Sequence, residues 1–332
     1  MRIKRRTRRF FWRSLRWLPV LAVVVFLYML FRPPARVTPS SIRVDMSPQR
    51  IERGRYLFTA LSACDGCHSE RDFARLGGPV VVSGRGKGME MTIQDLPGRI
   101  VASNITPDPE TGIGGWTDGE KIRAIREGVS KDGRALFPLM PYESYRLMAD
   151  SDVEALVAYM NTLPAVRNPL PKTEITFPAS MLMKSVPTPV TQAVLSPDSG
   201  GGEIYGEYVA AMAGCEVCHT PTKGIKKDPA LMLAGGRLFV TPFGTVASAN
   251  VTPDDETGIG NWTMAQFLER MNQFAAHEAA GAPPATPDQF TVMPWTSYSH
   301  LNNEDMEALF LFLKSRPAIS HKVQIHPTAN PR

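Results

Sequence analysis

Apolar residues recur at helical spacing near the ends of two similar regions of the chain. The positions are Val153, Leu156, Val157 and Met160 in the first region, and Met306, Leu309, Phe310 and Leu313 in the second. Intervals of three and four residues predict one amphipathic helix in each region. We expect Ser151 and Glu154 to form a capping box at the start of the first helix, and we expect Asn303 to suit the start of the second helix. Pro164 and Pro317 are expected to end the two helices.

The predicted helices belong to a repeat that runs through most of the chain. Three pairs of segments match: GRYLFTALSACDGCHSE (54–70) with GEYVAAMAGCEVCHTP (206–221), SNITPDPETGIGGWT (103–117) with ANVTPDDETGIGNWT (249–263), and MPYESY (140–145) with MPWTSY (293–298). The first pair predicts a short helical segment at the start of each copy. Stretches rich in Gly, Pro, Asn and Asp between the helices predict loops without strands. The pattern indicates one mainly α-helical fold used twice.

The repeat divides the 332 residues into five segments. They are residues 1–36, a basic N-terminus with an apolar run; 46–164, the first domain; 165–202, a Pro- and Gly-rich linker; 203–320, the second domain; and 321–332, a C-terminal tail. Each copy holds about 115 residues, enough for one small domain. With two or three helices and long loops, such a domain has little core of its own, so we expect something else to fill its interior.

The N-terminal segment combines positive charge with an apolar run. Residues 1–36 contain ten Lys and Arg and no acidic residue, and Trp17 to Phe31 are apolar without a charge. Positive residues before an apolar segment keep the N-terminus in the cytoplasm and direct the following chain across the membrane. No small-x-small cleavage site follows. We therefore predict a single uncleaved anchor in the bacterial cytoplasmic membrane, with both domains in the periplasm.

The distribution of charge excludes one class of partner. The net charge is +5, but the chain after residue 36 has 27 basic residues against 32 acidic ones. The basic character therefore belongs to the tail, and the body is mildly acidic. A nucleic-acid-binding function, which a basic body would favour, is excluded.

The four cysteines point to a cofactor. They fall into two Cys-x-x-Cys-His motifs, formed by Cys64, Cys67 and His68 and by Cys215, Cys218 and His219. This is the attachment sequence of c-type haem, in which two thiols form thioethers with one porphyrin and the histidine binds the iron. A zinc site would need a fourth ligand that neither motif supplies, and a thioredoxin-like dithiol would need a βαβ context. We predict two covalently bound haem c groups, which also fill the two interiors.

The sixth iron ligand is predicted from the remaining histidines and the methionines. His68 is the only histidine before residue 215, so the first haem can have two histidine ligands only by borrowing one from the other copy. Methionine is the next expectation. Met140 and Met293 occupy equivalent places in the two copies, each before a proline that fixes the local backbone. We predict these two as axial ligands, with His300 as the competing ligand in the second copy.

Four further residues are candidates for support of the haem pockets. Trp116 and Trp262 follow the repeated TGIG, and a buried indole N–H needs an acceptor. A haem propionate is one acceptor, and packing of the indole against the loop is the alternative. Asn104 and Asn250, in the repeated Asn-x-Thr-Pro-Asp segments, are expected to shape a turn through Asx-type hydrogen bonds.

The motifs CDGCH, GG, SNITPD, TGIG-W and MPY, followed by D-x-x-AL-x-x-YM, resemble a known family. It is the cytochrome c subunits of bacterial membrane-bound alcohol, aldehyde and gluconate dehydrogenases. The likeness covers roughly residues 50–320, recurs in both copies and implies two tandem class I-like cytochrome c domains, one fewer than is usual in that family. It also implies electron transfer from a periplasmic dehydrogenase to quinone, or onward to an oxidase or a soluble cytochrome.

We therefore predict an electron-transfer subunit and not an enzyme. Two six-coordinate haems leave no open iron for a substrate, and a one-electron relay needs none. A di-haem cytochrome c peroxidase is one alternative, but it would need one open iron, and both copies carry the Met-Pro motif. A cytochrome c subunit of a terminal oxidase is the other alternative.

Overall fold

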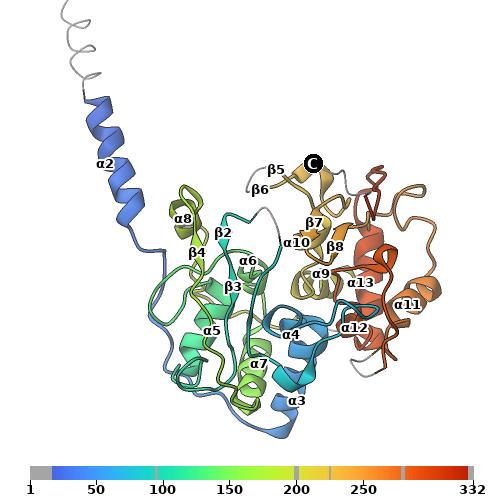
Figure 1. Cartoon of the computed structure of the whole chain (residues 1–332), viewed down its shortest axis with the longest axis horizontal. Helices are drawn as coiled ribbons and strands as arrows, with labels where there is room; N and C mark the ends of the chain where they lie inside the picture. The colour runs from blue at the N-terminus through green and yellow to red at the C-terminus, as the bar shows by residue number, and fades with distance from the viewer. Residues whose placement is uncertain (1–16, 94–95, 198–201, 224–225, 278–280, 328–332) are drawn as a thin grey trace, which may run out of the picture.

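The computed structural model describes residues 17–93, 96–197, 202–223, 226–277 and 281–327. The molecule is mainly helical, and short helices are joined by long loops, as the sequence predicted (Figure 1). The basic residues 1–16, which contributed to the anchor prediction, lie outside the described residues. We refer to residues 46–164 as the first half and to residues 203–320 as the second half.

Corresponding helices follow one another in the same order in both halves. The first half contains α3 (Pro48–Tyr56), α4 (Cys64–His68), α5 (Asp118–Glu127), α6 (Tyr142–Tyr145) and α7 (Asp150–Thr162), and the second contains α9 (Glu203–Met212), α10 (Cys215–His219), α11 (Met264–Asn272), α12 (Trp295–Tyr298) and α13 (Asn303–Ser315). The π-helical turn η1 (Leu57–Leu61) continues α3, and 3-10 turns lie at η2 (Val82–Gly84), η3 (Met183–Ser185), η4 (Pro229–Leu231) and η5 (Pro287–Gln289). The predicted helical segment before each Cys-x-x-Cys-His motif is confirmed.

Strands are short and pair only as two-stranded antiparallel sheets in the described residues. The pairs are β1 (Met89–Glu90) with β3 (Val101–Ala102), β2 (Gly98–Arg99) with β4 (Glu174–Ile175), β5 (Thr222–Lys223) with β6 (Lys226–Lys227), and β7 (Leu238–Thr241) with β8 (Gly244–Ala247). The expectation of loops alone is therefore wrong. The β7–β8 hairpin buries Phe239 and Val246 against Phe290, but a four-residue strand is too short to show alternation in the sequence.

The predicted ends of the two long helices are confirmed, but their predicted starts are not. α7 ends at Thr162 and α13 at Ser315, each two residues before the expected proline. The capping box on Ser151 is wrong because α7 begins at Asp150, which places Ser151 inside the first turn. The cap of α13 is Asn302, whose side chain accepts the N–H of Asp305, so Asn303 is already helical.

Capping boxes occur instead on the middle helix of each half. Thr117 caps α5 and pairs with Glu120, while Thr263 caps α11 and pairs with Gln266. In both cases the hydroxyl accepts the N3 backbone N–H and the N3 side chain accepts the N-cap N–H. The two halves therefore start this helix in the same way.

The first and last helices of each half cross at a glycine. α3 packs across α7 at Gly54, and α9 packs across α13 at Gly206. A Cβ atom at Gly54 would lie 1.9 Å from the carbonyl oxygen of Ala155, and one at Gly206 would lie 2.1 Å from that of Ala308. Since no side chain fits, glycine is what allows the two backbones to approach so closely.

The halves exchange equivalent hydrogen bonds across a shared hydrophobic core. The hydroxyl of Tyr56 donates to Asp305, and the hydroxyl of Tyr208 donates to Asp152. Each tyrosine oxygen also accepts, at 3.2 Å, the backbone N–H of the residue three positions before that aspartate. Asp305 is fully buried and Asp152 is 4% exposed. One cluster of buried apolar residues includes members of both halves, so the interface is part of the core.

The first part of the predicted linker packs on the first half. β4 pairs with β2, and the side chain of Asn168 donates to the carbonyl of Lys87 at 2.8 Å. Farther along, the short helix α8 (Ala179–Leu182) lies near the base of α2 (Leu18–Phe31) (Figure 1). There Phe177 contacts Phe26, and Lys184 donates to the carbonyl of Leu30 at 2.7 Å. This part of the linker therefore makes specific contacts.

The N-terminal apolar run forms α2, a helix of 14 residues that projects from the body (Figure 1). Crossing the hydrocarbon of a bilayer takes about 20 helical residues. Within the described ranges, no helix is both long enough and apolar enough for a membrane span. The prediction of a single N-terminal transmembrane anchor, and the cytoplasmic-membrane location that rested on it, is therefore wrong. The physical reason is length, because the backbone becomes extended at Arg32.

Candidate functional site

Each Cys-x-x-Cys-His motif forms a single helical turn that follows a left-handed residue. α4 is preceded by Ala63 at φ 43°, and α10 by Gly214 at φ 67°. Left-handed backbone favours glycine, so Ala63 adopts this conformation against its own preference. The sharp turn ends the preceding helix and redirects the chain, so that the cysteines and the histidine of each motif share one helical turn.

Both motif histidines make the same hydrogen bond. Nδ1 of His68 lies 2.8 Å from the carbonyl oxygen of Ser103, and Nδ1 of His219 lies 2.7 Å from that of Ala249. A carbonyl accepts only from a protonated nitrogen, so Nδ1 carries a hydrogen, and in the neutral ring Nε2 keeps its lone pair. Burial lowers the pKa of both histidines. Burial therefore favours the neutral imidazole, the form that binds a metal.

The asparagine loops set the position of these carbonyls. Oδ1 of Asn104 accepts the backbone N–H of Thr106 at 3.0 Å, and its Nδ2 donates to the carbonyl of Val166 at 2.7 Å. Asn250 makes the equivalent bonds. Its Oδ1 accepts the backbone N–H of Thr252 at 2.9 Å, and its Nδ2 donates to the carbonyl of Ile319 at 2.8 Å. The predicted Asx-type hydrogen bonds are confirmed. Each asparagine directly follows the residue whose carbonyl holds the histidine, so it positions that imidazole indirectly.

The two Met-Pro segments have matching backbones. Met140 and Met293 each accept, through their carbonyl, the N–H of the residue two positions later at 2.8 Å. The following prolines cap the one-turn helices α6 and α12. At the end of these turns, the hydroxyl of Tyr145 donates to Ser62, and that of Tyr298 donates to the carbonyl of Ala213. Each tyrosine thus joins its methionine segment to the backbone just before a Cys-x-x-Cys-His motif.

In the second half, all the predicted residues except Cys218 line one cavity of about 390 Å³. Cys215 and His219, both in α10, meet Met293 there, together with Asn250 and Trp262. Apolar side chains of the surrounding helices complete the wall: Phe267, Met271, Trp295, Tyr298, Leu309 and Leu313. His300 is exposed and is not among the lining residues.

In the first half, the equivalent residues gather around the hydrophobic core. Cys64, Trp116 and Met140 are partly buried and pack against the same apolar cluster. Cys67, like Cys218 in the second half, is exposed, and all four cysteines are free thiols. The second-half residues are therefore joined by a cavity, and the first-half residues by their contacts with the core.

The raised pKa values of the partly buried thiols argue against a redox dithiol. Burial raises the pKa of Cys64 well above its usual range and that of Cys215 to about 12. Redox-active cysteines have lowered pKa values, because the thiolate is the reactive form. Protonated thiols in an apolar setting, beside a neutral imidazole and a thioether, fit the attachment and ligation of a haem.

Sequence reasoning missed two arginines near these sites. Arg270 of α11 lines the second-half cavity and lies over the Trp295 ring, 4.5 Å from its centroid, without an acidic partner among the described residues. Arg71 reaches from the first half to the carbonyls of Val292 and Met293. No sequence pattern indicates the residues that either arginine contacts. The one available signal is that Arg71 lies only three residues after His68.

The mainly helical fold, with short helices joined by long loops, is consistent with a c-type cytochrome. No family model matches the chain. It is 30% identical to a diheme cytochrome c-type of Cereibacter sphaeroides over 279 residues, 80% of this chain and 86% of that one. By this measure the chain belongs to the diheme c-type cytochromes.

Cytochrome subunits of dehydrogenases are also similar to the chain. It is 28% identical, over 83% of its length, to the cytochrome c subunit of a quinone alcohol dehydrogenase of Gluconacetobacter polyoxogenes. It is 29% identical, over 80% of its length, to the gluconate 2-dehydrogenase cytochrome c subunit of Pantoea cypripedii. The chain spans 58% and 59% of these two relatives. The predicted resemblance is confirmed, and the relatives are cytochrome subunits, as expected for an electron-transfer subunit without a catalytic role.

Proposed function

We propose that this protein is an electron-transfer subunit with two covalently bound haem c groups, one in each half. The observation that carries the proposal is the second-half cavity, where the thiol and the imidazole of α10 meet the thioether of a distant segment within an apolar wall. Repetition of the same hydrogen bonds around His68 supports a second site of the same kind in the first half.

The residues divide into three roles. Cys64, Cys67, Cys215 and Cys218 would form the thioether bonds, His68 and His219 would bind iron through Nε2, and Met140 and Met293 would bind it through sulfur. When bound, haem supplies one-electron exchange between two oxidation states of iron. The chain's own contribution is to fix both imidazoles through Ser103 and Ala249 and to surround the site with apolar side chains.

Carboxylate groups of the cofactor would meet polar side chains in the second half. Arg270 offers a guanidinium along the cavity wall, and Trp262 offers an indole N–H. A guanidinium binds carboxylates with two parallel hydrogen bonds. Trp116 is the equivalent of Trp262 in the first half, and packing against its loop is the alternative role for both indoles.

We further propose that residues 46–164 and 203–320 are two tandem class I-like cytochrome c domains. The reciprocal bonds of Tyr56 with Asp305 and of Tyr208 with Asp152 support this division. They are the contacts expected of two copies related by an approximate two-fold axis.

The donor in this proposal is a dehydrogenase, and the acceptor is quinone, an oxidase or a soluble cytochrome. The names of the related subunits support a dehydrogenase partner. An electron relay needs two closed iron sites, because electrons can pass without binding of a substrate at the metal.

Spectroscopy of the mature protein tests this function. With methionine bound to both irons, the oxidised protein should show the far-red sulfur-to-iron band, and the reduced protein should not bind carbon monoxide. A reductive titration should end after two electrons per chain. A carbon monoxide complex, or rapid turnover of hydrogen peroxide with a reduced donor, would show an open iron and favour the peroxidase instead.

A further inference from the structure

The segment after the first Cys-x-x-Cys-His motif crosses to the second half. Residues 71–78, called the arm below, are joined to residues 283–285 by two backbone hydrogen bonds of 2.9 Å. Phe73 of the arm packs against Phe243 and Phe290, with ring centroids 5.1 and 5.6 Å apart. The arm belongs to the first half by sequence but is bound to the second half by contact.

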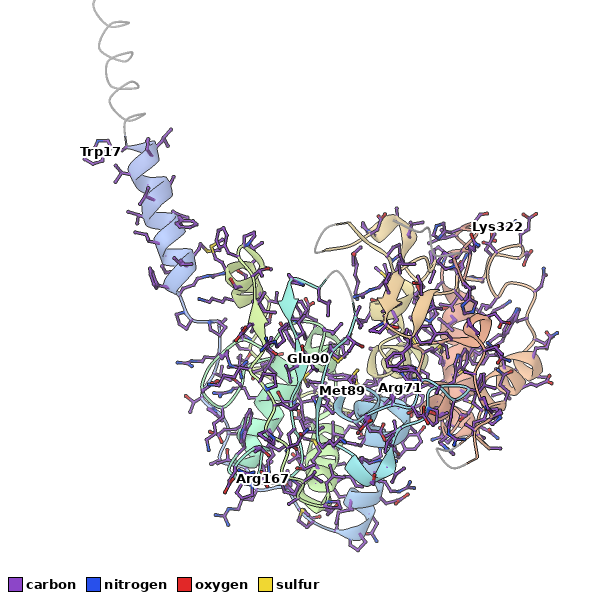
Figure 2. The ribbon with its side chains drawn as sticks, viewed as in Figure 1. Trp17, Arg71, Met89, Glu90, Arg167 and Lys322 are labelled. Atoms are coloured by element: carbon purple, nitrogen blue, oxygen red, sulfur yellow. The ribbon has the colours of Figure 1, made fainter. Side chains whose placement is uncertain are left out.

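Arg71 begins the arm and lies between the halves (Figure 2). Its Nη1 donates to the carbonyl oxygen of Val292 at 2.9 Å, and its Nη2 lies 3.4 Å from that of Met293. Two more bonds tie it to its own half, from Nε to Gly78 at 2.7 Å and from Nη2 to Gly77 at 2.9 Å. A planar guanidinium held on both sides fixes the carbonyls it binds relative to each other.

Among the described residues, Arg71 has no hydrogen-bonded acid, although the buried carboxylate of Asp65, which is paired with Arg85, interacts with it electrostatically. All four of its hydrogen bonds go to backbone carbonyls, and within the described ranges no carboxylate accepts from it. The guanidinium also lies over the Phe73 ring, 4.8 Å from its centroid. A positive charge is therefore held beside the Met293 segment.

The opposite arrangement does not occur in the described residues. The position that matches Arg71 in the second half is Thr222, which begins β5. No side-chain cation of the described residues donates to the carbonyl of Met140, which accepts the N–H of Tyr142. Among the described residues, an arginine of the first half therefore binds the methionine segment of the second half, but no equivalent residue of the second half binds the methionine segment of the first.

We propose that Arg71 is a positioning residue for Met293, so that sulfur ligation in the second half depends on the first half. The inference rests on the proposed function, because it takes Met293 as an iron ligand. By holding the carbonyls of residues 292 and 293, the guanidinium limits how far the thioether can withdraw. Its charge would also disfavour the more positive, oxidised state of an iron bound by Met293, and so would raise the reduction potential of that haem.

The test compares Arg71→Gln and Arg71→Lys in the full-length mature protein. Exogenous imidazole competes with methionine for oxidised iron and reports how firmly the sulfur is held. In Arg71→Gln we expect one of the two haems to bind imidazole roughly tenfold more tightly, since bonds to a charged donor are lost. Its far-red sulfur band should weaken, and its reduction potential should fall. Arg71→Lys should restore the potential, because it keeps the charge, but not the imidazole affinity.

Arg75→Gln is the matched control. Arg75 lies in the same arm and donates to the carbonyl of Ala282 at 2.7 Å, far along the chain from Met293. Arg75→Gln should leave the imidazole affinity within about twofold of the wild type and the reduction potential unchanged. Equal effects of Arg71→Gln and Arg75→Gln would overturn the positioning role and leave only a structural role for the arm.

Met293→Leu identifies which haem responds. The haem affected by Arg71→Gln should be the one that loses its sulfur band in Met293→Leu, and a response confined to the haem of Met140 would overturn the inference. If the wild type carries no haem or shows no sulfur band, the proposed function itself fails. If it carries two haems with the full band and Arg71→Gln and Arg71→Lys bind imidazole like the wild type, only the positioning role fails.

Discussion

The two halves of the molecule share their internal framework and differ where they meet. In both, a glycine at a helix crossing, an asparagine loop and a tyrosine after the Met-Pro segment make the same contacts. At the interface, Asp152 is bound by an arginine and a tyrosine, whereas Asp305 is bound by two tyrosines. The comparison indicates that the contacts around each predicted cofactor site are the same in both halves, whereas the hydrogen bonds at the interface differ between them.

The largest effect is expected at the helix crossings. Alanine at Gly54 or Gly206 would place a Cβ about 2 Å from a backbone carbonyl of the crossing helix. The helices must move apart, so we expect each substitution to lower the free energy of unfolding by about 3 kcal/mol. Chemical denaturation of the mature protein measures this, and equal losses would support the same framework in both halves.

Gly115→Ala is the control for the crossings. A Cβ there meets no atom within 4 Å, so the free energy of unfolding should change little. The shared framework would be contradicted if only one of Gly54→Ala and Gly206→Ala were destabilising.

A smaller and unequal effect is expected for the interface tyrosines. Tyr208→Phe leaves Asp152 with Arg53, whose Nε and Nη2 donate to its two oxygens at 2.8 and 2.7 Å. Tyr56→Phe leaves the fully buried Asp305 with Tyr205 alone. A hydrogen bond to a charged group contributes roughly 1.5–3 kcal/mol. We expect about 2 kcal/mol of destabilisation for Tyr56→Phe and about 1 for Tyr208→Phe.

Thermal and chemical unfolding of both variants check this order. Tyr28→Phe serves as the control, because Tyr28 is 65% exposed on α2. A larger loss for Tyr208→Phe than for Tyr56→Phe would mean that Arg53 does not compensate for the missing hydroxyl.

The smallest expected effect depends on pH. Burial raises the pKa of Glu127 at the end of α5, and its Oε2 has no hydrogen-bond partner. The folded chain therefore binds this proton more tightly than the unfolded chain, and the associated stability is lost as pH rises through the folded pKa. Gln273 occupies the matching position of the second half. Glu127→Gln should thus gain stability relative to the wild type as pH rises.

Unfolding measured from acidic to neutral pH tests this linkage. Glu110→Gln, at an exposed ion pair with Arg167, should show no comparable trend. A difference between Glu127→Gln and the wild type that shrinks as pH rises has the wrong sign for a carboxyl with a raised pKa.

Local features of the fold and site could be predicted from sequence, because their signals lie within a few residues. The helical period and Pro164 predicted the end of α7, and the Asn-x-Thr pattern predicted the turn bonds of Asn104 and Asn250. The cap of α7 was missed because several polar residues precede the apolar period, and sequence alone does not decide which of them is the first helical one.

Contacts between distant residues could not be predicted. Tyr56 and Asp305 are 249 positions apart, and in sequence each looks like an ordinary polar position on an amphipathic helix. Only the crossing of the two halves makes them partners. The anchor prediction failed for a different reason: the apolar run does form a helix, but α2 has 14 residues, fewer than the about 20 that cross a bilayer.

Mass spectrometry of the mature protein tests the central claim most directly. The account predicts that the wild type exceeds its polypeptide mass by two haem groups. It also predicts that Cys64→Ala/Cys67→Ala and Cys215→Ala/Cys218→Ala each exceed it by one. A wild-type mass equal to the polypeptide alone, or to the polypeptide with a single haem, would contradict the claim that each half holds its own covalently attached group.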